Sequence, residues 1–206
     1  MENFDLFNLA LLELQVFMLV FFRIAAIFYT APLLGSRNTP AVAKIGMSFL
    51  VTVIIYPAVR GNFVMPGDIL SYGLLVFQQV LVGVVIGYTA YLLFAAIQLA
   101  GQIIDLQMGF GIVNVIDPMS NTQVSIIGQF QFILGMMIFM AINGHHYLFQ
   151  SVVDSLRLAP LDSVGITTAA AGRISELFSQ MFLVAFKIAG PATVALFLTN
   201  VTLGLI

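Results

Sequence analysis

Cysteine is absent from this sequence, and only 8% of its 206 residues are charged. Without cysteine the chain can form no disulfide, no thiolate metal site and no thiol nucleophile. A soluble globular domain has about 25% charged residues. A chain of this length that is 61% hydrophobic, with a mean hydropathy of +1.08, cannot hide its apolar surface in its own core. That surface must face lipid, other subunits or both, which predicts an integral membrane protein.

Basic residues are scarce as well. The chain has 7 Lys and Arg residues against 9 Asp and Glu, giving a net charge of −2. Nucleic-acid binding needs clustered Lys and Arg, so we expect no nucleic-acid partner. Before the first apolar run stand Glu2 and Asp5 without a basic residue, which is not the positive start of a secretory signal. We expect the first apolar segment to remain in the mature protein.

Motifs of catalysis and metal binding are missing too. The sequence has no nucleophile–base arrangement, no glycine-rich phosphate loop, no HExxH and no CxxC. Asn143-Gly144-His145-His146 suggests a metal site or a proton relay, but adjacent histidines on a helix point about 100° apart and do not converge on one ion. We interpret them as interfacial or hydrogen-bonded side chains. The sequence predicts no catalytic residue, no bound metal and no cofactor, and therefore no enzyme.

Long apolar runs are what the chain has instead. They fall into five blocks, which cover residues 6–31, 42–59, 68–105, 117–154 and 177–206. Transmembrane strands are about 10 residues long with alternating polarity, whereas these runs are longer and continuously apolar. Because only a helix satisfies the backbone of one long segment in lipid, the sequence predicts an all-α fold.

The third and fourth blocks are too long for simple spans. Each contains 36 consecutive uncharged residues, and a helix of that length measures about 54 Å against a hydrocarbon core of about 30 Å. Each must tilt steeply, break, form a hairpin or extend into a protein assembly. A plain hydropathy count would give about five or six spans, and these two blocks make that count unsafe.

Proline marks the expected breaks in these runs. We predict a turn at each of five prolines that stand near the ends of apolar runs or between them. At a sixth proline, inside the fifth block, we predict a kink. The turns are at Ala31-Pro32, Tyr56-Pro57, Met65-Pro66, Asp117-Pro118 and Ala159-Pro160, and the kink is at Gly190-Pro191.

A polar stripe ends the third block. Gln98, Gln102 and Asp105 stand at positions i, i+4 and i+7, which share one face of a helix. Lipid cannot satisfy polar groups at this depth, so we expect the stripe to face protein or water.

Among the charges inside apolar blocks, Arg23 is expected to have a structural pairing or a subunit contact. A proton pathway would need a deep carboxylate, for which Glu13 and Asp105 are the candidates.

The stretch after this stripe combines two glycines with bulky apolar residues. Met108-Gly109-Phe110-Gly111 offers a flexible backbone and deformable side chains, which a constriction would need. Spacing alone fits a plain turn between helices better.

Earlier in the third block, Gly83 and Gly87 form a small-xxx-small motif, which predicts close packing against a neighbouring helix.

Several short motifs, in the right order and with similar spacing, resemble the FliR family of the flagellar type III protein-export gate. They are Ala31-Pro32, Gly101-Gln102-Ile103-Ile104 (where the family often has Gly-Glu-Ile-Ile), Leu106-Gln107-Met108-Gly109, Asp117-Pro118, Asn143-Gly144-His145, and Asn200 with Leu203-Gly204-Leu205-Ile206. The related subunits of virulence injectisomes share this core pattern. The resemblance covers the whole chain.

The resemblance implies a role and a set of partners. FliR-family proteins sit as one copy among several copies of FliP and FliQ, forming a helical gate of kinked helices and hairpins in the bacterial inner membrane, within the flagellar basal body. FlhB and FlhA lie nearby, and unfolded flagellar proteins pass through the pore. The family continues beyond its Leu-Gly-Leu motif, so residues 1–206 are expected to form a single helical membrane domain of FliR type without the family's C-terminal portion.

The family's loop after Leu-Gln-Met-Gly projects into the central pore and helps to plug it. Carried over, that loop contains Met108, Gly109, Phe110, Gly111, Ile112 and Val115.

The rival hypothesis from another class is a stand-alone secondary transporter or channel, which predicts two repeated halves with broken helices around a polar site. We find no convincing repeat. A membrane enzyme ranks third, because it would need a catalytic constellation.

Overall fold

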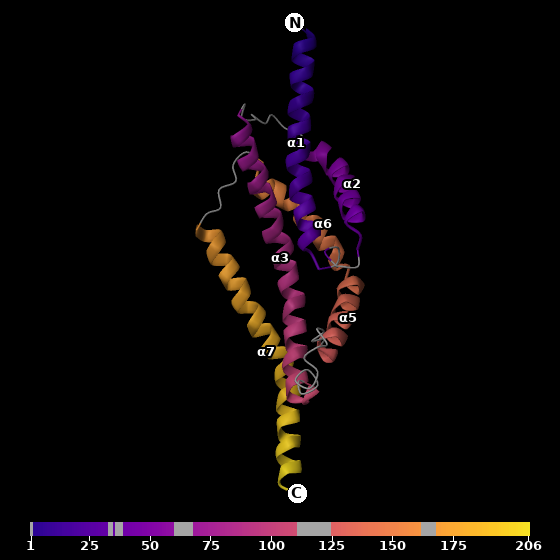
Figure 1. The fold of residues 1–206 in the computed structure, drawn as a ribbon, viewed down its shortest axis with the longest axis vertical. Coiled ribbons are helices and arrows are strands. Elements are labelled where there is room, and N and C mark those ends of the chain that lie inside the picture. The colour runs from indigo at the N-terminus through magenta and orange to yellow at the C-terminus, as the bar shows by residue number, and fades with distance from the viewer. Residues whose placement is uncertain (1, 33–34, 36–38, 60–67, 111–124, 162–167) are drawn as a thin grey trace, which may run out of the picture. The chain divides into compact units, whose positions relative to one another are not determined.

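Helices make up nearly all of the described structure. The computed structural model describes residues 2–32, 35, 39–59, 68–110, 125–161 and 168–206 (Figure 1). Its helices are α1 (Glu2–Thr30), α2 (Ala41–Val59), α3 (Ile69–Gln107), α5 (Ile126–Ala141), α6 (Gly144–Leu158) and α7 (Thr168–Gly204). These residues contain no strand, which confirms the prediction of an all-α fold.

Four helices are long and apolar enough to cross a membrane. They contain the candidate spans Ala10–Thr30, Ala41–Val59, Ile69–Gln107 and Gly172–Gly204. The pair α5 and α6 passes the same test when the two are taken together, which would make five. The prediction of a polytopic membrane protein is confirmed.

The two over-long blocks have different structures: the third is one continuous helix, and the fourth is interrupted. The third block is one unbroken helix, α3, whose 39 residues measure about 58 Å. The fourth block is interrupted at Ile142 and Asn143, between the end of α5 and the start of α6. Asn143 has a φ of 58°, a left-handed conformation that ends a helix and that asparagine tolerates better than most residues.

Prolines end two helices as predicted, and one prediction is wrong. α1 ends at Thr30 before Ala31-Pro32, and α6 ends at Leu158 before Ala159-Pro160. The turn expected at Tyr56-Pro57 does not form, because α2 continues through Pro57 to Val59. Pro57 removes one helical hydrogen bond and its ring crowds the carbonyl four residues before it, but only two residues of the helix follow, so the disturbance is confined to the last turn. Met65-Pro66 and Asp117-Pro118 lie outside the described residues.

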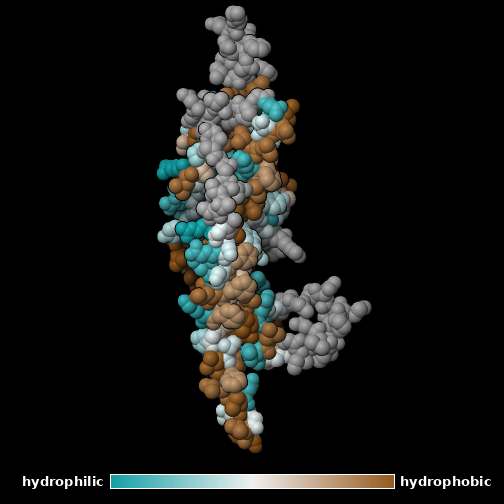
Figure 2. All heavy atoms as spheres, turned by 90° about the vertical axis from the view of Figure 1, so that its left-hand side faces the viewer, coloured by the Kyte–Doolittle hydropathy of each residue, from teal (hydrophilic) through white to brown (hydrophobic). Residues whose placement is uncertain are grey.

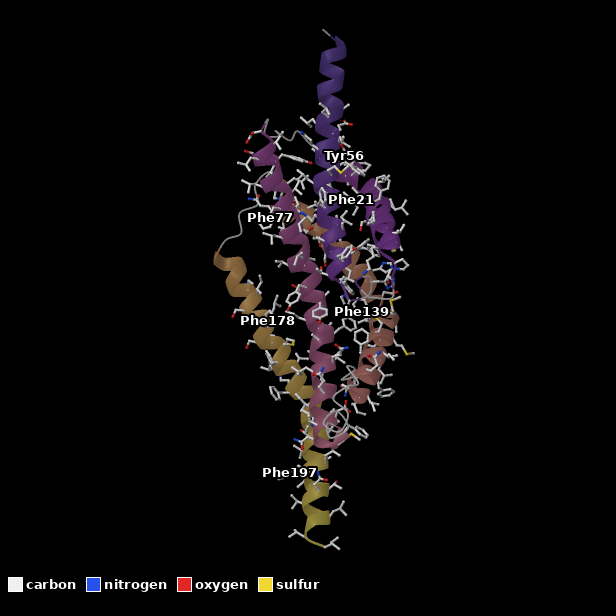
Figure 3. All side chains as sticks on the ribbon, in the orientation of Figure 1. Phe21, Tyr56, Phe77, Phe139, Phe178 and Phe197 are labelled. Atoms are coloured by element: carbon white, nitrogen blue, oxygen red, sulfur yellow. The ribbon has the colours of Figure 1, made fainter. Side chains whose placement is uncertain are left out.

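α7 remains helical through its internal proline. The helix runs from Thr168 to Gly204 with Pro191 inside it. It changes direction between Phe178 and Phe197, which lie on either side of that proline (Figure 3). A kink is the expected result when a proline removes one helical hydrogen bond and its ring displaces a carbonyl.

The chain forms two compact units, and residues 1–91 with 145–171 make up the first. Its core is a cluster of aliphatic and aromatic side chains from α1 and α6, closed by Leu161. The buried members are Val16, Leu19, Val20, Ile24, Ile27, Phe28, Val152, Leu156 and Leu161. α1 and α2 form an antiparallel hairpin, since Phe17 stacks edge-on against Phe49 and Tyr56 while Lys44 lies 4.9 Å from the Tyr29 ring.

α2 buries its polar residues and exposes its apolar ones. The residues that it buries are Lys44, Ser48 and Thr52, which stand four apart on one face. The hydroxyls of Ser48 and Thr52 donate to the carbonyls of Lys44 and Ser48, each at 2.7 Å, so both are satisfied. The exposed face carries Val42, Ile45, Phe49, Leu50, Val53 and Ile54. This inverted pattern is typical of a helix surrounded by lipid or other apolar subunits rather than by water.

The second unit contains residues 92–144 and 172–206. Small side chains let α3 and α7 approach closely in its core, where Ala96 and Ala100 pack with Ala185 and Ala189. α5 runs antiparallel to α3, since Gly101 lies against Gly128 while the ring of Phe94, earlier on α3, contacts those of Phe132 and Phe139, later on α5, at 5.7 and 5.5 Å. The end of α7 is covered by little of the chain, and hydrophobic side chains gather over it (Figure 2).

Candidate functional site

A buried arginine lies at the centre of the first unit. Arg23 on α1 is fully buried, and its Nε donates to Oε1 of Gln79 on α3 at 2.7 Å. Nη2 donates to the same oxygen. Nη1 donates to the carbonyl of Ser155 and Nη2 to that of Ala159, both at 2.8 Å. Four N–H donations therefore tie α1 to α3 and to the C-terminal end of α6.

Backbone and amide oxygens, rather than a carboxylate, receive this charge. α6 ends at Leu158, and both carbonyls stand at that end: Ser155 lies in the last turn, where its carbonyl also accepts from the amide of Ala159 at 2.9 Å, and Ala159 follows the last helical residue. A cation there also meets the negative end of the helix dipole. Gln79 extends the network, because its Nε2 donates to the carbonyl of Leu161 at 3.2 Å. A buried charge with its donors satisfied in this way is tolerated.

The glycine pair of the third block lies against α1. A Cβ on Gly83 would stand 2.4 Å from the carbonyl oxygen of Arg23 and 2.7 Å from the Cβ of Ala26. A Cβ on Gly87 would stand 1.9 Å from Oγ1 of Thr30 and 2.8 Å from the carbonyl oxygen of Ile27. The two helices therefore approach each other closely at both positions, and Gly83 lies directly against the backbone of the buried arginine.

The three residues of the predicted polar stripe have different surroundings. Asp105 is buried, Gln98 is partly buried and Gln102 is exposed. Oδ1 of Asp105 accepts from the backbone N–H of Ile127 at 3.3 Å, at the N-terminus of α5. Its Oδ2 is buried and accepts no hydrogen bond from the residues described. Only Asp105 of this stripe bridges to another helix through a side-chain hydrogen bond in the described structure.

α3 ends in the motif that carries the family resemblance. The amide of Met108 donates to Ile104 at 3.0 Å and that of Gly109 to Leu106 at 3.2 Å. Gly109 has a φ of +81°, the left-handed conformation that commonly ends a helix and that glycine adopts without strain. Met108 and Phe110 are both more than 40% exposed within the chain. Gly111, Ile112 and Val115 lie outside the described residues.

The histidine pair does not gather further ligands. The rings of His145 and His146 lie 4.5 Å apart, at the start of α6. Nowhere in the described ranges do three or more His, Cys, Asp or Glu side chains come close enough to hold a metal ion.

Sequence reasoning missed the acceptors of Arg23. The arginine is visible as a charge inside an apolar block, but its partners are a neutral glutamine 56 residues away and two carbonyls more than 130 residues away. Backbone carbonyls carry no sequence signal. The adjacent pair Gln78-Gln79 inside a long apolar block is the one hint that the sequence gives.

The fold and these contacts define a class of protein: a helical membrane protein whose helices are joined by buried polar contacts and close glycine packing. The model of the family described as "Bacterial export proteins, family 1" matches residues 14–206. The chain belongs to this family.

Curated relatives agree with this assignment. The chain is 38% identical to the flagellar biosynthetic protein FliR of Bacillus subtilis, over 92% of this chain and 74% of that protein. It is 31% identical to FliR of Escherichia coli K12, over 89% of this chain and 70% of that protein. The FliR of Caulobacter vibrioides is 26% identical over 94% of this chain and 78% of its own length.

Proposed function

We propose that this chain is the FliR-type subunit of a flagellar type III protein-export gate in the bacterial inner membrane. In this role it is not an enzyme. It joins several copies of FliP and FliQ, with FlhB and FlhA nearby, to form the channel for unfolded flagellar proteins. The observation that carries the proposal is the similarity to flagellar FliR proteins over nine tenths of the chain.

The exposed apolar surface supports a subunit rather than a lone protein. Only 17% of the span in α2 and 11% of that in α7 is buried within the chain. The terminal turns of α7 expose Phe197, Leu198 and Leu203, and Leu205 just beyond the helix is exposed as well. Apolar area of this extent needs a cover, which lipid supplies for a span and neighbouring subunits supply in an assembly.

The seal of this channel is assigned to the segment that begins at Met108. Methionine and phenylalanine are large and apolar, and methionine adapts to irregular partners, so they can close around different side chains while excluding ions. Gly109 supports the proposal, because its left-handed backbone turns the chain away from the axis of α3 at this point. The proposed seal comprises Met108, Gly109, Phe110, Gly111, Ile112 and Val115.

Affinity purification tests the assembly. The tagged chain is co-expressed with its genomic neighbours, and the product is weighed by native mass spectrometry. We expect one copy of this chain with several copies of two small membrane proteins. A stable lone protein, or a homo-oligomer that binds a small solute, would instead favour a secondary transporter.

Deletion of the gene distinguishes a flagellar role from a role in an injectisome, because only the flagellar role predicts loss of filaments and swimming.

A further inference from the structure

The end of α3 and the start of α5 are fastened together at two neighbouring points. A Cβ on Gly101 would stand 2.2 Å from the Cα of Gly128, so the two backbones touch. One helical turn further along α3, Oδ1 of Asp105 accepts from the amide of Ile127 at 3.3 Å. We name these four residues the α3–α5 clasp.

The chemistry of a helix start explains why a carboxylate serves here. The first amides of a helix have no partner within it. Ser125, the N-cap of α5, accepts from the amide of Gly128 at 2.8 Å, and Asp105 accepts from that of Ile127. A carboxylate also meets the positive end of the helix dipole. Asp105 therefore acts as a second cap of α5, supplied from another helix.

This bond lies in a place where a carboxylate is costly. Asp105 is only 7% exposed, and its Oδ2 accepts no hydrogen bond in the described part of the chain. The residue before it, Ile104, belongs to the buried apolar cluster between α3 and α7. An aliphatic side chain would pack there without desolvating a charge. The carboxylate loses hydration on burial, which an aliphatic side chain would not. In return it accepts a hydrogen bond from the start of α5.

We propose that Asp105 is a positioning residue that fixes the start of α5 against the end of α3. The clasp holds residues 105 and 127 together, and the segment assigned to the seal begins three residues after one and ends before the other. The clasp therefore fixes the end of α3, from which the segment assigned to the seal begins. The consequence for the seal depends on the export-gate function proposed above, whereas the clasp itself does not.

Spin labels test the clasp directly, because the native chain has no cysteine. The exposed residues Leu106 and Ile126 flank it and are replaced by labelled cysteines. In the full chain we expect one narrow distance distribution. Asp105→Ala should at least double its width, while Asp105→Asn, which keeps an acceptor oxygen, should largely restore it. An Asp105→Ala distribution as narrow as the parent's overturns the proposal.

Two further variants keep this test decisive. Glu176→Ala removes an exposed carboxylate on α7 and should leave the distribution unchanged. Gly101→Ala places a methyl group against the backbone of Gly128 and should lengthen the mean distance. If Asp105→Ala cannot be purified, the Gly101→Ala distribution decides the matter, and an unchanged mean distance overturns the proposal.

The link to the seal is measured on the co-purified complex in vesicles. Asp105→Ala complexes of normal subunit composition should leak small ions several-fold faster than the parent, and Asp105→Asn complexes should stay tight. A widened distance without a leak overturns the positioning role in the seal. If the parent chain forms no complex at all, the proposed function fails, and the spin-label result on the chain alone still decides the clasp.

Discussion

Nε of Arg23 donates to Oε1 of Gln79 at 2.7 Å, although the two residues stand 56 positions apart and both side chains are fully buried. A second donation, from Nη2, reaches the same oxygen. The planar guanidinium can meet one amide oxygen and two carbonyls at once, since its five N–H groups point in fixed directions. This contact joins α1, α3 and the end of α6 in the first unit.

Removal of the glutamine should therefore destabilise the first unit. Gln79→Leu leaves two N–H groups of Arg23 and the carbonyl of Leu161 without their partner. Unsatisfied buried groups cost about 1–3 kcal/mol each, and more when charged, so we expect a loss of about 3 kcal/mol. Thermal unfolding of the purified chain in detergent measures it. Gln180→Leu, at an exposed position of α7, is the matched control. Equal melting temperatures for the two variants would contradict the prediction.

The close approach of α1 and α3 predicts opposite effects for identical substitutions on one helix. Gly83→Ala and Gly87→Ala put a methyl group into the backbone of α1, and overpacking of this kind costs about 1–3 kcal/mol. Gly73→Ala, also on α3, meets nothing within 4 Å. It should be neutral or stabilising by up to about 1 kcal/mol, because alanine favours helix more than glycine does.

Thermal stability of the three alanine variants, in the same detergent, decides this prediction. The expected order of melting temperature is Gly73→Ala highest, then the parent, then the other two. A Gly83→Ala chain as stable as Gly73→Ala would mean that α1 and α3 can separate at that point without loss.

The proposed seal predicts a leak without loss of assembly. Replacing Met108 and Phe110 together by alanine removes bulk and apolar area at the end of α3, where both side chains are exposed within the chain. Complexes of normal composition should then conduct small ions in vesicles at a rate several-fold above the parent. Double substitution of Leu50 and Val53 by alanine, on the exposed face of α2, controls for general loss of apolar side chains. Ion-tight complexes of the Met108 and Phe110 variant would refute their role as a plug.

The apolar face of α2 predicts sensitivity to charge. Ile54 is 75% exposed within the chain and lies on the face that lipid or subunits must cover. Ile54→Lys should reduce membrane insertion or assembly, since a lysine in the middle of a span costs about 2.5–3.5 kcal/mol on insertion scales. The amount of membrane-integrated chain, compared with that of Ile54→Val, measures the effect. Unchanged integration and assembly would show that Ile54 faces water.

Much of the helical architecture could be predicted because it depends on local properties. The apolar runs gave the helices, and Pro32 and Pro160 gave two of their ends. Tyr56-Pro57 misled, because α2 continues for two residues past Pro57 and ends there, so the proline disturbs the last turn without starting a new segment. The pair of Gly83 and Gly87 pointed to close packing but did not identify α1 as the neighbour.

The candidate site was less accessible to sequence reasoning. The polar stripe has the spacing of one helical face, but burial separates Asp105 from Gln102, because only the former lies beneath the start of α5. Lys44 stood out only as a boundary of its apolar block, and the structure buries it over the ring of Tyr29. Facing residues on different helices are not fixed by spacing within either one.

The sequence by itself determined that this chain is helical, that it belongs in a membrane and to which family it is similar, because hydropathy, proline positions and short motifs are properties of neighbouring residues. Only the tertiary structure decided which oxygens receive the charge of Arg23 and which amide meets Asp105. Those partners are backbone groups and a neutral amide, whose positions depend on how distant helices pack. A buried polar group must find a partner wherever the fold supplies one, and no local pattern records where that is.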